Sequence, residues 1–224
     1  ILIIDASKEF KKEGKQNILQ EKHIARLVDT YLERKPQEGY SALIYREDIL
    51  ENDYNLNIPR YVIAKSEDID HDVDAHLLGG IPRKNIKELT LLNTMVADIL
   101  KTSLRELRPE YFELTKDIEE VFLSDKVTAL SEEVTTAIRD YITKYWAVIT
   151  NAKAEADIKG IMDEMLMDIK ELLSGFNFAN AYDGYQIISE IWKDSLSEDM
   201  ELIGQSDFYT AAYLLIGNPS KSPI

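Results

Sequence analysis

The chain is divided by a polar run in its first third, Asn52-Asp53-Tyr54-Asn55-Leu56-Asn57-Ile58-Pro59-Arg60-Tyr61-Val62. Asparagine and aspartate side chains compete for backbone hydrogen bonds and therefore favour turns over helices and strands. Pro59 disfavours a helical conformation at Ile58. The run therefore predicts an irregular connection, and composition alone leaves open whether it is a plain polar loop or a functional site.

Short strands and one helix are expected before this run. Ile1-Leu2-Ile3-Ile4 is a continuous apolar run, typical of a strand buried on both faces, so its sheet neighbours are expected upstream of this chain. Residues 20–34 repeat apolar side chains at three- and four-residue intervals and predict an amphipathic helix. Asn17 and His23 are expected on the exposed surface. The other expected elements are a charged loop over 8–15, a strand over 40–45 and a helical turn over 46–51.

From Asn85 to about Leu202 the pattern is helical almost throughout. Apolar side chains recur at helical spacing in wide stripes, and Met162, Met165 and Met167 are expected to fill the core between them. The expected helices cover 86–107, 110–123, a long stretch after Ser131, 154–173 and a further stretch opening near Asn180. The predicted fold class is therefore mainly α, with a helical, bundle-like C-terminal region preceded by a short α/β remnant.

An acidic run over 67–76 suggests a calcium-binding loop at first sight. A count from Asp68 places Val73 where such a loop needs glycine and Gly79 where it needs glutamate. The calcium interpretation therefore fails.

The two histidines in this region do not predict a zinc site either. His71 and His76 are five residues apart, whereas a helical zinc pair is four apart. The simpler prediction is a short helix with aspartate at its N-terminal end, which buries Ile69, Val73 and Leu77. No metal ligand is predicted in this chain.

Composition excludes several classes of function. The 224 residues include no cysteine, so disulfides, a thiol nucleophile and thiolate metal sites are excluded; this fits a reducing cytoplasm. No apolar run approaches the roughly 20 residues that a membrane span requires. A net charge of −15 argues against a stand-alone nucleic-acid-binding domain and is compatible with a basic protein partner.

The polar run over residues 52–62 resembles a signature near the end of the methyltransferase domain in modification (M) subunits of type I restriction-modification systems. The opening Ile3-Ile4-Asp5-Ala6-Ser7-Lys8-Glu9-Phe10 looks like the last catalytic-domain strand of that family, and Gln16-Asn17 follows in the expected order. The segments 74–82 and 182–203 also resemble parts of these subunits. The chain is thus identified as the C-terminal part of such a subunit.

This resemblance implies that the intact subunit is an N6-adenine DNA methyltransferase that uses S-adenosylmethionine in the cytoplasm. Its partners would be a specificity (S) subunit, a restriction subunit and DNA bound through the complex. Residues 1–65 would be the trailing edge of the methyltransferase domain, and residues 66–224 a helical region that assembles with the S subunit. In the signature the candidate DNA- or pocket-facing residues are Asn52, Tyr54, Asn55, Asn57, Arg60 and Tyr61, although a loop that joins the two regions is the simpler interpretation.

The chemistry that such an enzyme needs is missing from this chain. The only double glycine, Gly79-Gly80, precedes Ile-Pro, and the only Asn-Pro, at Asn218-Pro219, precedes serine, so neither a donor-binding turn nor an Asn-Pro-Pro-aromatic loop is present. No phosphate loop, nucleophile elbow or zinc-protease motif occurs. No catalytic or cofactor-binding residue is therefore predicted. The alternative function is an acidic, all-helical protein interaction module unrelated to methylation.

Overall fold

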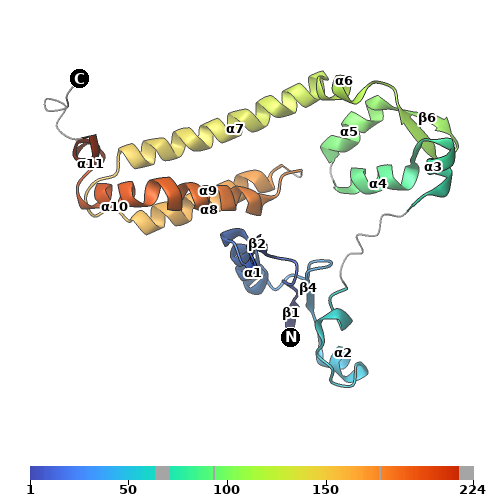
Figure 1. Cartoon of the computed structure of the whole chain (residues 1–224), viewed down its shortest axis with the longest axis horizontal. Coiled ribbons are helices and arrows are strands. Elements are labelled where there is room, and N and C mark those ends of the chain that lie inside the picture. The colour runs from blue at the N-terminus through green and yellow to red at the C-terminus, as the bar shows by residue number, and fades with distance from the viewer. Residues whose placement is uncertain (64–70, 93, 177, 217–224) are drawn as a thin grey trace. The chain divides into compact units, whose positions relative to one another are not determined.

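The computed structural model describes residues 1–63, 71–92, 94–176 and 178–216 (Figure 1). The chain divides into two compact units, residues 1–69 with 182–189, and residues 70–181 with 190–224. Helices account for most of the described residues, and the strands form small sheets of two or three strands. The predicted fold class, mainly α with a short α/β part, is therefore confirmed.

The first unit is built around one helix and two small antiparallel sheets. Strand β1 (Leu2–Ile4) pairs with β4 (Ser41–Leu43), so that Ile3 lies opposite Ala42. The stretch 8–15, expected to be a charged loop, instead contains β2 (Lys11–Glu13), which forms a hairpin with β3 (Gln16–Ile18) just after it. Gly14 turns this hairpin at a φ of 59°, a left-handed conformation that glycine adopts without strain. The remaining elements are α1 (Glu21–Glu33), α2 (Arg46–Glu51) and the 3-10 helix η1 (Ile58–Arg60).

The buried side of α1 differs from the expected one. The residues facing the interior are His23 and Thr30, whereas the predicted apolar side includes Val28 and Leu32, which are 48% and 70% exposed. The expectation that His23 lies on the surface is therefore wrong, and Asn17 is exposed as expected. Periodicity identified the helix, but which face packs inward depends on the partners that the rest of the unit supplies.

The second unit begins with a three-stranded sheet and its helices. The elements are α3 (Val73–Leu78), β5 (Ile81–Pro82), α4 (Arg83–Leu92), α5 (Thr94–Ser103), β6 (Leu104–Arg108) and β7 (Tyr111–Leu114), in the strand order β5-β7-β6. Helix α3 begins as predicted at an aspartate, because the Asp72 carboxylate accepts a hydrogen bond from the Ala75 N–H. However, Val73 and Leu77 are 65% and 77% exposed, so their predicted burial is wrong, and Ile69 lies outside the described residues.

The hairpin of β6 and β7 corrects the predicted helices 86–107 and 110–123, because the end of the first and the start of the second are strands. Pro109 favours an extended Arg108, and Glu110 has a φ of 69°, so the chain reverses between the two strands. Glu106 pairs with Phe112 and Arg108 with Tyr111, with an irregular register between them. The leucine spacing that suggested a helix thus belongs to α4 and α5, and α5 ends at Ser103.

One arginine fixes α3 to this hairpin. The Arg108 guanidinium stacks on the Tyr111 ring at 3.3 Å and donates hydrogen bonds to the backbone carbonyls of Asp74 and Gly79. Tyr111 in turn donates its hydroxyl to the Asp72 carboxylate, 3.0 Å away. A Cβ at Gly80 would lie 3.1 Å from the Tyr111 Cβ, which explains the absence of a side chain there.

Among the described residues, the helices that follow residue 117 contain most of the buried apolar side chains. The elements are α6 (Ile118–Phe122), α7 (Asp125–Thr150), α8 (Ile158–Ser174), α9 (Ala181–Ile191), the π-helix η2 (Trp192–Leu196), α10 (Ser197–Gln205) and α11 (Phe208–Ile216). Helix α7 begins after Ser124 and passes through Ser131, so it starts earlier than the helix predicted after Ser131. Met165 is buried as expected, whereas Met167 is 55% exposed.

A substitution at Met200 tests where the core of the second unit lies, because the Met200 side chain is fully buried at 0% exposure. Met200→Ala is expected to lower the free energy of unfolding by about 2–5 kcal/mol, from lost burial and the cavity left behind. Urea denaturation monitored by circular dichroism measures this loss. Met167→Ala is the matched control and should change stability by about 0.5 kcal/mol or less; equal effects would place the core elsewhere.

Candidate functional site

The signature loop, residues 52–62, begins where α2 ends. The Asn52 side-chain amide donates to the Asp48 backbone carbonyl at 2.8 Å and so closes the end of the helix. Asp53 and Tyr54 follow with φ values of 54° and 58°, two consecutive left-handed conformations without glycine. Such residues carry strain that the surrounding contacts must offset. The polar residues of the signature are therefore first of all the means of making a tight turn.

Side chains then hold the rest of the loop in one conformation. The Asn55 side-chain oxygen accepts the Asn57 N–H at 2.9 Å, and the Asn55 carbonyl accepts the Tyr61 hydroxyl at 2.6 Å. Arg60 makes a longer hydrogen bond, 3.4 Å, to the Asn52 side-chain oxygen. Val62 ends the loop and is buried at 3% exposure, which anchors it to the first unit.

The structure brings together five of the six candidate residues and leaves one free of the cluster. Asn52, Asn55, Asn57, Arg60 and Tyr61 are joined through the hydrogen bonds above, whereas Tyr54 projects into solvent at 71% exposure. Contact of any of them with DNA or a catalytic pocket remains a prediction. The geometry accounts for the asparagines as loop-forming residues and leaves Tyr54 as the side chain most available to a ligand.

A partly buried polar network beside α1 was not predicted. The Arg26 guanidinium donates to the Glu9 carboxylate at 2.5 Å and lies 3.7 Å over the Tyr40 ring. His23 accepts the Gln20 N–H on Nδ1, so its Nε2 carries the proton toward Glu9, 3.7 Å away. Burial raises the pKa of the Tyr40 hydroxyl, which keeps it protonated. The only sequence signal is the i, i+3, i+7 spacing of His23, Arg26 and Thr30, which mark one face.

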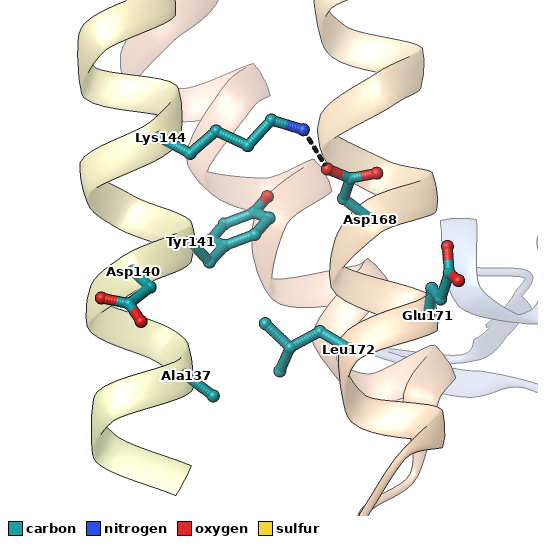
Figure 2. Close-up of a pocket in the computed structure, with 7 residues that line it drawn as sticks. All are labelled: Ala137, Asp140, Tyr141, Lys144, Asp168, Glu171 and Leu172. Atoms are coloured by element: carbon teal, nitrogen blue, oxygen red, sulfur yellow. Dashed lines mark hydrogen bonds and ion pairs between the residues drawn. The ribbon is translucent and has the colours of Figure 1, made fainter. Parts of the chain in front are cut away.

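A polar clamp joins α7 to α8 in the second unit (Figure 2). Lys144 lies 2.5 Å from the Asp168 carboxylate and 3.0 Å from that of Glu164. The Tyr145 hydroxyl donates to the same Asp168 oxygen at 2.7 Å. Four residues earlier on α7, the buried Tyr141 hydroxyl donates to the backbone carbonyl of Met165 at 2.9 Å.

Protonation states in this clamp are held by its hydrogen bonds. The bond to Asp168 raises the pKa of Lys144, and the bond from Lys144 lowers the pKa of Asp168. Burial, and then the bond to Asp168, raise the pKa of Tyr145 to about 12. Lys144 is thus held as an ammonium ion and Asp168 as a carboxylate, so neither is prepared to act as a nucleophile or to exchange a proton near neutral pH.

A groove of about 480 Å³ runs beside the clamp, lined by Ala137, Asp140, Tyr141, Lys144, Asp168, Glu171 and Leu172 (Figure 2). The lining carries three carboxylates and one cation, and that cation is already paired with Asp168. The groove therefore suits a packing surface better than a reaction site.

The remaining candidates for chemistry are weak. His71 Nδ1 and His76 Nε2 lie 3.2 Å apart, and both residues are exposed. Among the described residues, no group of three or more His, Cys, Asp or Glu side chains is placed to hold a metal ion. Within the same residues, every helix is too short or too polar to cross a bilayer.

A match to a protein family indicates which class of protein the chain is similar to. Residues 1–70 match the N-6 DNA Methylase family. No solved structure matches the chain.

The individual proteins to which the chain is similar are methylase subunits of type I restriction enzymes. The chain is 43% identical over 106 residues to the MjaVII methylase subunit of Methanocaldococcus jannaschii, which covers 45% of this chain and 18% of that protein. It is 32% identical over 101 residues to the MpnII methylase subunit of Mycoplasma pneumoniae, covering 44% of this chain and 19% of the relative. The chain thus spans less than a fifth of these relatives, and over the matched residues the resemblance to a type I modification subunit is confirmed.

Tyr61→Phe tests whether the signature loop depends on its internal hydrogen bonds. Removing the hydroxyl leaves the Asn55 carbonyl without its partner, so the free energy of unfolding should fall by about 1 kcal/mol. Tyr54→Phe is the matched control, because that ring is exposed, and it should leave stability unchanged. Urea denaturation of both variants decides the matter; a loss in Tyr54→Phe equal to that in Tyr61→Phe would contradict this account of the loop.

Asp168→Asn tests the clamp through its pH dependence. The folded-state pKa of Asp168 is lowered, so its stabilisation is present above the unfolded value of 3.8 and is lost as pH falls through the folded value. At pH 7 the variant should therefore melt at a lower temperature than the wild type, and the difference should shrink below about pH 4. Glu171→Gln, in the same groove, should melt like the wild type at pH 7. A difference for Asp168→Asn that does not change with pH would refute the ionic contribution.

Proposed function

We propose that this chain is the C-terminal part of a type I modification subunit, in which residues 1–65 are the edge of the methylase domain and residues 66–224 assemble with the specificity subunit. The intact subunit transfers a methyl group from S-adenosylmethionine to adenine N6 in DNA, in the cytoplasm, and works with a restriction subunit. The match of residues 1–70 to the N-6 DNA Methylase family, and the similarity of 45% of the chain to a methylase subunit, support the first part of this proposal.

The exposed apolar surface of the first unit supports its place in a larger domain. Ile24, Val28, Tyr31 and Leu32 lie along α1 at helical spacing and are 42%, 48%, 58% and 70% exposed. The buried apolar side chains described in this unit are few: Tyr40, Ile44 and Val62. A helix with such a stripe is stable when another element covers it. In the intact subunit that element is the remainder of the methylase domain.

The observation that carries the assembly role is an aromatic ledge on the second unit, made of Trp146, Phe208 and Tyr209. Trp146 and Phe208 stack edge-on at 6.0 Å, and Phe208 and Tyr209 at 5.6 Å. Trp146 and Tyr209 nevertheless remain 60% and 77% exposed. Rigid, exposed Trp and Tyr side chains are the residues that most often dominate protein interfaces. The clamp between α7 and α8 holds the helix that presents Trp146.

Binding of the specificity subunit tests the assembly role. The chain, co-expressed with the specificity subunit of its own system, should co-purify, and titration should give a measurable Kd. Trp146→Ala should weaken binding by about 30-fold, the effect of losing an interface residue worth about 2 kcal/mol. Phe122→Ala is the matched control, because Phe122 is an exposed aromatic residue of α6 at 66%. Absence of binding by the wild-type chain would refute the assembly role.

The methylase part is tested by the methyl donor. The chain lacks both sequence motifs that would hold S-adenosylmethionine and adenine, so calorimetry with S-adenosylmethionine should give no binding heat. The full-length subunit should bind the donor and methylate DNA. Donor binding by the 224-residue chain alone would contradict the assignment of residues 1–65 as only the edge of the domain.

A further inference from the structure

The first two turns of α9 lie on α1, within the first unit. The Tyr182 hydroxyl donates to the Asp29 carboxylate at 2.9 Å, and Lys22 Nζ lies 2.7 Å from the Asp183 carboxylate. The Lys22 backbone N–H donates to the side-chain carbonyl of Gln186 at 3.0 Å. These three contacts join residues that are 153, 161 and 164 positions apart in the sequence.

Gln186 adds a distant acceptor to the local cap of α1. The first N–H groups of a helix have no partner inside the helix, and a nearby side chain usually accepts one of them. In α1 a capping box between Gln20 and His23 supplies the local cap, and the N–H of Lys22, one residue after the helix begins, is accepted by the Gln186 side chain from α9. One N–H of the first turn of α1 therefore keeps its partner only while α9 is in place.

The contact is polar and only partly shielded from solvent. The side chains of Lys22 and Asp183 are 29% and 53% exposed, and Ile187, one residue after Gln186, is 56% exposed. Burial, and then the bond to Asp29, raise the pKa of Tyr182, so this hydroxyl stays a donor. Exposed ion pairs and hydrogen bonds contribute little stability each, so a contact made of them opens at low cost.

The helix that makes this contact does not end there. Residues 182–189 belong to the first unit, and the same helix continues to Ile191, which is counted with the second unit. It then becomes the π-helix Trp192–Leu196, in which Trp192 is buried. Short π-helical segments inside α-helices often occur at functional sites. The segment that contacts α1 is thus joined to the second unit by a continuous helical backbone.

We propose that residues 182–189 form a reversible strap on α1, which is docked in the free chain and leaves α1 when the helical region binds its protein partner. The strap reports assembly to the methylase unit by supplying or withdrawing the acceptor of the Lys22 N–H in the first turn of α1. This inference rests on the proposed function only for the event that releases the strap, and the docked state is tested separately.

Hydrogen–deuterium exchange of the full 224-residue chain tests the docked state. Gln186→Ala removes the acceptor of the Lys22 N–H, so the amide of Lys22 and its neighbours in the first turn of α1 should exchange about fivefold faster. Tyr182→Phe, which keeps the ring, should have a smaller effect in the same direction. Ile187→Ala, on the exposed side of α9, is the matched control and should exchange like the wild type.

Raising the salt concentration to about 1 M should also speed exchange in the unmutated chain, by screening the Lys22–Asp183 pair. Equal protection in Gln186→Ala and Ile187→Ala would overturn the strap.

Exchange in the complex with the specificity subunit tests release. The first turn of α1 should lose protection on complex formation by about the same factor as in Gln186→Ala, and that variant should show no further loss. A complex that forms with unchanged protection at α1 would overturn release while leaving the proposed function intact. A failure to form any complex would refute the proposed function and the release event together. The docked strap is tested independently, by exchange in the variants of the free chain.

Discussion

Asp168 sets how α7 and α8 pack together. Its carboxylate accepts hydrogen bonds from both Lys144 and Tyr145, and Tyr141 uses the Met165 carbonyl one turn away. Buried hydroxyl groups are costly without a partner, so both tyrosines must reach their acceptors at once. Because the two donors are four residues apart on α7 and the two acceptors three apart on α8, the pair of helices satisfies them in one register. The apolar contacts of Ile149, Leu166 and Ile169 supply burial energy, but they would tolerate other registers better than these hydrogen bonds do.

The first unit is organised by a different constraint. Its interior contains His23, Thr30 and Ser41, beside the part-buried ion pair of Glu9 and Arg26, and these polar groups connect the segments around α1. A polar interior gives direction and specificity but little net stabilisation, because the groups give up contacts with water to form it. The apolar side of α1 is left on the surface. This combination is what one expects of part of a domain, and it agrees with a chain that spans less than a fifth of the methylase subunits it resembles.

Local hydrogen bonds and contacts distant in sequence make different contributions to the proposed function. The signature loop is formed by bonds between residues 48 and 61, so its shape does not depend on the second unit. The α1 N-terminus, in contrast, has one of its N–H groups, that of Lys22, accepted by the distant Gln186 side chain. A regulatory link between assembly and methylation would therefore run through α1 rather than through the signature loop, although the loop carries the more distinctive sequence.

The sequence by itself determined the family resemblance, the mainly α fold and the approximate bounds of α1, β4, α2 and α8, because apolar periodicity and turn residues act over short distances. It also identified the polar run as a turn, since asparagine and proline restrict the backbone wherever they occur. Only the tertiary structure decided that His23 is buried while Val28 is exposed, since burial depends on which neighbours a helix face meets. The same holds for the hairpin at 104–114, where strand pairing outweighed a leucine spacing that fits a helix. The clamp at Asp168 and the hydrogen bond to Gln186 join residues up to 164 positions apart, and no local pattern encodes such a pairing.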